Sequence, residues 1–133
     1  MPACILIAED NEANLALVEY LLRATGHRTV AATDGHQAVH LAKQIRPDLI
    51  ICDLQMPEVD GYSVLAQVRE DSTLREVPVI ALTAFSRRID RTTVLVAGFD
   101  GYLSKPIDPE VFIEQVEQYL KPSQRTGGLP RKP

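Results

Sequence analysis

Short, mostly apolar runs alternate with segments of helical periodicity along this chain, and this alternation constrains its fold more than any other feature. We expect strands at residues 4–8, 28–32, 49–52, 77–82 and 101–103. Apolar runs of this length, bounded by turn residues, are typical of strands buried on both faces of a sheet. Strands that alternate with helices predict βαβ units. The chain is therefore predicted to be an α/β domain with a parallel sheet and right-handed crossovers.

The segments between and after these runs are predicted to form five helices, the first of them between the first two strands. Asp34 stands three residues before Gln37, which is the spacing of a capping box, and Asp60 can cap the next helix. Asp108 is followed by proline, as is typical of a helix start. The weakest prediction is a helix over residues 87–97, because its apolar stripe is thin.

Length and charge limit the function further. The chain has 133 residues and a net charge of −4, and we expect one domain at residues 1–121 followed by a disordered tail or linker at 122–133. An acidic domain without a basic stripe argues against direct binding of nucleic acid. The chain also lacks a signal peptide pattern and any apolar stretch of the length that a membrane span requires, so we expect a cytoplasmic protein.

Polar side chains stand at the carboxyl ends of four predicted strands. Glu9 and Asp10 follow the first strand, Asp53 the third and Lys105 the fifth, while Thr83 ends the fourth. Because the carboxyl ends of parallel strands share the edge where ligands bind, we expect these side chains to meet. Three converging carboxylates need a cation between them, and hard oxygen ligands suit Mg²⁺. A carboxylate nucleophile beside a metal, a lysine and a hydroxyl is typical of a site that forms an aspartyl phosphate.

Four motifs contain these residues and their neighbours. They are Glu9-Asp10-Asn11, Asp53-Leu-Gln-Met-Pro57 with Gly61, Pro78-Val-Ile-Ala-Leu-Thr83-Ala84, and Gly101-Tyr102-Leu-Ser-Lys105-Pro106. Over residues 3–121 they resemble the receiver domain of two-component response regulators, in the style of single-domain receivers of the DivK type and of receivers in hybrid histidine kinases. The resemblance implies a doubly wound, flavodoxin-like sheet of order 2-1-3-4-5 with five helices on its two faces.

The resemblance also implies how the site works. Asp53 would be the phosphoacceptor, taking the phosphoryl group from a histidine kinase or a histidine phosphotransfer protein. Asp10 and Asp53 would bind Mg²⁺ through their carboxylates, Gln55 through its backbone carbonyl and Glu9 mainly through water. Lys105 would pair with the phosphoryl oxygens.

Further roles concern the response to phosphorylation. Thr83 would hydrogen-bond to the phosphoryl group, and Tyr102 matches the aromatic switch position. The peptide between Lys105 and Pro106 is expected to be cis. A downstream protein would bind the face formed by the fourth helix, the fifth strand and the fifth helix. A basic stretch made of Arg87, Arg88 and Arg91 belongs to the fourth helix of this face.

The chain is thus expected to be a signalling phosphoacceptor without an output domain, which assists its own phosphorylation and dephosphorylation but is not otherwise an enzyme. A phosphohydrolase with an aspartyl nucleophile stays an alternative, although such enzymes usually carry a second acid where Gln55 stands. A flavin or nucleotide binder fits less well, because the loop after the first strand is not glycine-rich. In a third alternative the tail leads into an output domain.

Overall fold

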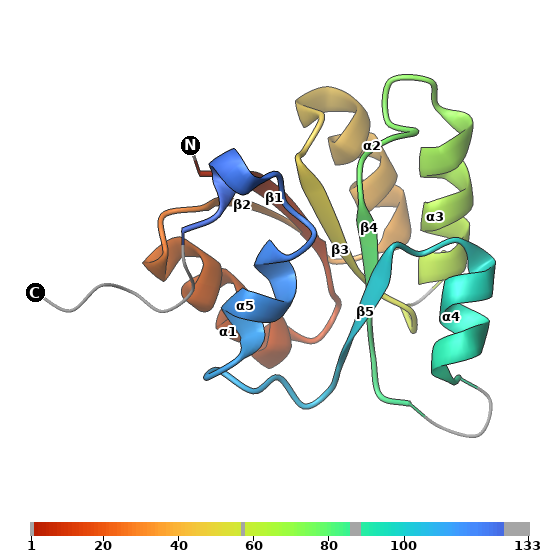
Figure 1. Cartoon of the computed structure of the whole chain (residues 1–133). Helices are drawn as coiled ribbons and strands as arrows, with labels where there is room; N and C mark the ends of the chain where they lie inside the picture. Colours follow the sequence, from red (N-terminus) through yellow and green to blue (C-terminus); the bar gives the residue numbers. More distant parts are fainter. Residues whose placement is uncertain (1, 57, 86–88, 127–133) are drawn as a thin grey trace, which may run out of the picture.

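The structure is a computed structural model that describes residues 2–56, 58–85 and 89–126. Its strands form one parallel five-stranded sheet in the order β2-β1-β3-β4-β5, with helices on both faces (Figure 1). This order confirms the doubly wound fold that the motifs implied. The strands are β1 (Cys4–Ala8), β2 (Arg28–Ala32), β3 (Leu49–Asp53), β4 (Val79–Thr83) and β5 (Gly101–Ser104).

The described residues contain five α-helices, and most of them begin where the sequence predicts. Asp34 accepts a hydrogen bond from the Gln37 N–H at 2.8 Å, and Asp60 accepts one from the Ser63 N–H at 3.0 Å. None of these helices is long and apolar enough to cross a membrane. The helices are α1 (Glu12–Ala24), α2 (Gly35–Ile45), α3 (Gly61–Glu70), α4 (Arg91–Ala97) and α5 (Phe112–Glu117).

Two helices begin later than the sequence predicted. The fourth was expected from residue 87, but α4 begins at Arg91 because Asp90 is its N-cap and accepts the Thr93 N–H at 2.7 Å. Residues 86–88 lie outside the described residues. Asp108 caps only a turn, in which its carboxylate accepts the Glu110 N–H at 3.0 Å, and α5 begins after that turn.

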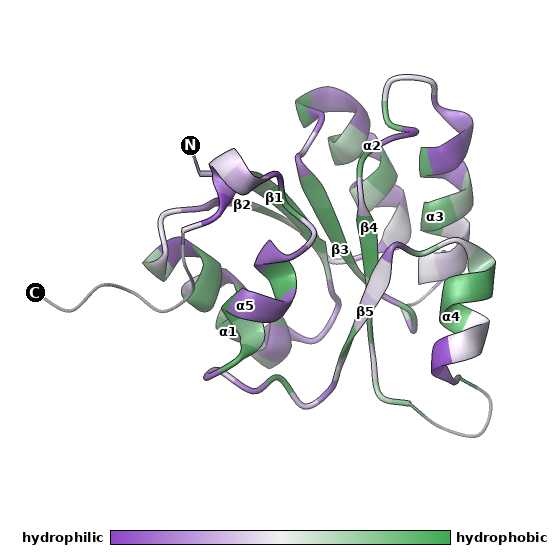
Figure 2. Cartoon of the chain, viewed as in Figure 1, coloured by the Kyte–Doolittle hydropathy of each residue, from purple (hydrophilic) through white to green (hydrophobic). Residues whose placement is uncertain are grey.

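The core has two layers, one on each face of the sheet. Successive strand residues point to opposite faces, so Leu6 belongs to one layer and Ile5 and Ile7 to the other. Helices α2, α3 and α4 cover the first layer, and α1 and α5 cover the second. All residues of β3 and β4 are buried, and Figure 2 shows hydrophobic residues along these central strands. Polar side chains that belong to the buried strands are thereby restricted to the strand ends.

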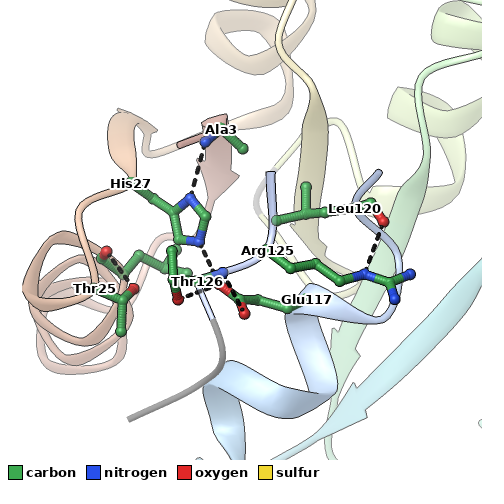
Figure 3. A network of polar contacts seen from close by, with 8 residues as sticks. Ala3, Thr25, His27, Glu117, Leu120, Arg125 and Thr126 are labelled. Carbon is green, nitrogen blue, oxygen red and sulfur yellow. Dashed lines mark hydrogen bonds and ion pairs between the residues drawn. The ribbon is translucent and has the colours of Figure 1, made fainter. Parts of the chain in front are cut away.

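The two ends of the strands form two opposite edges of the sheet. We call the edge with the carboxyl ends of the strands the site edge, and the edge with their amino ends the base edge. At the base edge, residues 122–126 lie within the segment predicted as a tail, and they form the short helix η1 (Pro122–Gln124) followed by a contact with α5. The Thr126 N–H donates to both carboxylate oxygens of Glu117, at 2.9 and 3.0 Å (Figure 3). The described part of this segment therefore packs on the domain.

Candidate functional site

Asp53 lies at the centre of the site edge, where the buried strand β3 ends. Its side chain is almost fully buried, and its Oδ2 lies 3.0 Å from the Lys105 Nζ. Its Oδ1 accepts a hydrogen bond from the Gln55 N–H at 3.0 Å. The loop after β3 folds back tightly over this point, because a Cβ at Gly61 would stand 2.6 Å from the Asp53 carbonyl oxygen. The backbone therefore holds the Asp53 carboxylate in a fixed place.

Two further carboxylates from the end of β1 meet Asp53. Oxygens of Glu9, Asp10 and Asp53 all lie within 4.8 Å of one another. Asp10 is exposed, whereas Glu9 is fully buried. The Glu9 Oε1 lies 3.1 Å from the Lys105 Nζ, but within the described part of the chain it accepts no hydrogen bond of acceptable geometry. The structure thus brings together the three acids and the lysine that the sequence placed at this edge.

The charges of this cluster do not cancel. Burial, followed by the neighbouring Asp53, raises the pKa of Glu9 to about 7, and Lys105 offsets only part of this effect. Burial acts to lower the pKa of Lys105, but Asp53 and Glu9 together raise it above its ordinary value. One ammonium therefore faces three carboxylates. A buried carboxylate oxygen without a hydrogen bond, next to two more carboxylates, fits a hard divalent cation.

Thr83 and Lys105 are placed by the ends of neighbouring strands. The Lys105 N–H donates to the Thr83 carbonyl at 2.9 Å, and the peptide between Lys105 and Pro106 is cis, as predicted. The Thr83 hydroxyl is buried, and its hydrogen-bond contact within the described part of the chain is a long one of 3.4 Å to the Ala84 carbonyl. Since this distance is at the limit of a hydrogen bond, the hydroxyl is available to another acceptor.

Tyr102 lies on β5 beside Ala81 and belongs to a separate aromatic group. Its ring packs edge to face against Phe85, with the ring centroids 5.2 Å apart. The Arg91 guanidinium carbon lies 5.8 Å from the Tyr102 centroid. The sequence placed Arg91 only in a basic stretch, so its position beside these rings is new. Arg87 and Arg88 of that stretch lie outside the described residues, as does Pro57 of the motif after Asp53.

Comparisons with known proteins agree on one family. A family model described as the response regulator receiver domain matches residues 5–117. The polar-differentiation response regulator DivK of Brucella anthropi is 42% identical over 120 residues, which cover 90% of this chain and 98% of the relative.

Two solved structures show the same likeness. One is the receiver domain of the sensor histidine kinase PA1611 from Pseudomonas aeruginosa PAO1, which is described with a magnesium ion in its active-site cleft. It is 37% identical with a TM-score of 0.81, and the match covers 90% of this chain and 98% of that one. The chemotaxis response regulator CheY4 of Vibrio cholerae has a TM-score of 0.84 at 28% identity, with 90% and 100% covered.

Proposed function

This chain belongs to the response regulator receiver family and is a phosphoacceptor of two-component signalling, and from this premise we propose that Asp53 is the residue that accepts the phosphoryl group. The observation that carries the proposal is the position of Asp53, which is a buried carboxylate at a strand end, 3.0 Å from the Lys105 Nζ. Receiver domains take the group from histidine kinases or histidine phosphotransfer proteins. The donor for this chain is therefore a phosphohistidine.

In the transfer, an Asp53 carboxylate oxygen attacks the phosphorus atom, the bond between phosphorus and the donor nitrogen breaks, and the donor histidine keeps the electron pair and takes up a proton. Lys105 neutralises part of the charge on the phosphoryl oxygens, because its ammonium already lies beside Asp53. The Thr83 hydroxyl donates to one of these oxygens, since its present contact is long. Positioning and charge neutralisation of this kind supply most of the catalysis in phosphoryl transfer. By the same groups the chain assists its own phosphorylation and dephosphorylation.

The acid cluster is the proposed site for Mg²⁺. The carboxylates of Asp10 and Asp53, the backbone carbonyl of Gln55 and, through water, Glu9 would hold the ion. Once bound, Mg²⁺ supplies positive charge that screens both the nucleophile and the incoming phosphoryl group. The raised pKa of Glu9 and its oxygen without a hydrogen bond support this assignment, as does the magnesium described in the PA1611 receiver.

A downstream protein is the proposed reader of the modified state. Thr83 and Tyr102 would pass the change at Asp53 to a face made of α4, β5 and α5. This face exposes apolar side chains, among them Val96, which is 81% exposed. We place the function in the cytoplasm, where thiols such as the free Cys4 and Cys52 stay reduced.

The proposal is tested by exchanging the acceptor. Incubation with Mg²⁺ and a small phosphodonor such as acetyl phosphate should label the wild-type protein on one residue, and Asp53→Asn should abolish the label. Asp71→Asn is the matched control, because Asp71 is a half-buried carboxylate at the end of α3 and does not belong to the acid cluster. Undiminished labelling of Asp53→Asn would overturn the assignment. Steady release of phosphate from small phosphate esters would instead favour the phosphohydrolase alternative.

A further inference from the structure

We propose that Arg91 is a positioning residue that holds the Tyr102 ring in its present orientation and thereby sets how readily this receiver switches. The inference rests on the proposed function only in assuming that Tyr102 is the switch residue. It concerns the resting position of that ring, which is a property of the unphosphorylated protein.

Three groups from three elements form the contact. Phe85 follows β4, Arg91 is the first residue of α4, and Tyr102 lies on β5. The two rings meet edge to face at an angle of 85°. The Arg91 guanidinium carbon lies 6.0 Å from the Phe85 centroid and 5.8 Å from the Tyr102 centroid. Both distances fall in the range of cation–π interactions. We call these three residues the aromatic clamp.

The start of α4 leaves the Arg91 charge available for the rings. The neighbouring carboxylate of Asp90 is engaged as the helix cap, since it accepts the Thr93 N–H at 2.7 Å and the Thr93 hydroxyl at 2.8 Å. These bonds hold the pKa of Asp90 below its usual value. Among the described residues, Arg91 takes part in no ion pair. Its described partners are therefore the two rings.

The surroundings of the clamp allow it to open. A surface cavity of about 410 Å³ is lined by Phe85, Asp90, Arg91 and Thr92. The guanidinium is exposed and can swing into this space without disturbing the core. Tyr102 is only half-buried, so its ring can leave Phe85 once the cation is displaced.

The clamp ties the ring to the proposed partner face. Arg91 begins the same helix that exposes Leu95 and Val96, at 48% and 81%. A movement of the Tyr102 ring away from its present position breaks the contact with α4, and a partner that shifts α4 removes the same contact. Phosphorylation and partner binding therefore both act against the contact between Arg91 and the Tyr102 ring. Loss of this contact should raise the population of the switched state even in the unphosphorylated protein.

The expected effect is modest and measurable. An exposed cation–π interaction corresponds to about a two- to five-fold change in an equilibrium. In unphosphorylated protein with ¹³C-labelled tyrosine rings, relaxation dispersion should show a minor state of Tyr102 whose population rises by about this factor in Arg91→Gln. Arg91→Lys keeps the charge but not the planar group, and should restore part of the wild-type population.

Arg23→Gln is the matched control, because Arg23 is also exposed and binds Glu19 on α1 at 2.8 Å. The clamp is refuted if Arg91→Gln leaves the Tyr102 ring signals and the minor population as they are in Arg23→Gln. It is also refuted if Arg91→Lys behaves like Arg91→Gln, since the charge would then be irrelevant. Neither outcome depends on Asp53 labelling, so failure of the clamp and failure of the proposed function are distinguishable.

Discussion

The two edges of the sheet each bury a carboxylate against a basic side chain, but they satisfy it differently. At the base edge, Glu117 faces His27 and receives hydrogen bonds from Thr126. At the site edge, Glu9 faces Lys105 with one oxygen that accepts no hydrogen bond in the described structure. A buried polar network whose hydrogen bonds are all made holds the structure in place. A buried network in which an acceptor lacks a hydrogen bond can bind a further ligand at that acceptor.

The base edge is a closed network. The His27 side chain is fully buried, and its Nδ1 accepts the Ala3 N–H at 2.9 Å. The ring proton must therefore sit on Nε2, which donates to Glu117 at 2.7 Å (Figure 3). Burial alone would raise the pKa of Glu117, but hydrogen bonds from Thr126 and His27 hold it below its usual value. The ionised carboxylate thus stabilises the fold here.

At the site edge, the ionised carboxylate has the opposite effect on the stability of the fold. Burial and the nearby Asp53 raise the pKa of Glu9 to about 7, so ionised Glu9 destabilises the folded state. A cation bound at this edge would recover part of that free energy, because it would pair with the ionised carboxylates. The two acid–base pairs are buried to a similar degree, so what distinguishes them is the hydrogen bonding of the carboxylate.

The largest effect is expected from breaking the closed network. His27→Ala leaves the Ala3 N–H without its acceptor, removes the hydrogen bond from His27 to the buried Glu117 carboxylate and opens a cavity, so the free energy of unfolding should fall by about 3 kcal/mol. Urea unfolding measures the change. His36→Ala is the control on an exposed face of α2 and should stay within about 0.5 kcal/mol of the wild type. A loss below about 1 kcal/mol for His27→Ala would show that the network is not structural.

At the site edge, removing the buried charge is expected to raise the free energy of unfolding, by less than the loss of His27 lowers it. Native Glu9 keeps its proton up to about pH 7, whereas an unfolded chain releases it near the ordinary value of 4.5. The native state therefore binds more protons between these pH values, and its stability falls as the pH rises through this window. Without divalent metal at pH 8, Glu9→Gln should raise the free energy of unfolding by about 1–2 kcal/mol.

The matched measurements are urea unfolding of both proteins at pH 5 and pH 8, with and without Mg²⁺. The gain from Glu9→Gln should shrink at pH 5, where Glu9 is protonated in the native wild type. Mg²⁺ should stabilise the wild type more than the variant. Equal pH dependence of the two proteins would show that Glu9 ionises in the folded state without cost.

The sequence predicted which side chains meet at the site edge, but it did not predict the pairing of side chains at the base edge. The position of Asp53 follows from a local pattern, because an apolar run that stops at an acid defines a strand end, although the strand order came from the resemblance. The start of α4 was misplaced because the thin apolar stripe gave no boundary and Asp90 was not recognised as a cap. No local pattern links His27 to Glu117, which lies 90 residues away. Their pairing depends on how α5 docks, so only the folded chain shows it.

The smallest effect is expected where the described end of the chain joins the base edge. Thr126→Val removes the hydroxyl that donates to the Glu117 Oε2 at 2.6 Å but keeps the backbone N–H bonds, so the free energy of unfolding should fall by about 1 kcal/mol. Thr126→Ser keeps the hydroxyl and should behave like the wild type. Hydrogen exchange should speed up at the Thr126 amide of the valine variant, while the Mg²⁺ response of the site edge stays the same. If the valine and serine variants are equally stable, the contact of residues 122–126 with Glu117 contributes nothing to the closed network, and the contrast between the edges rests on His27 alone.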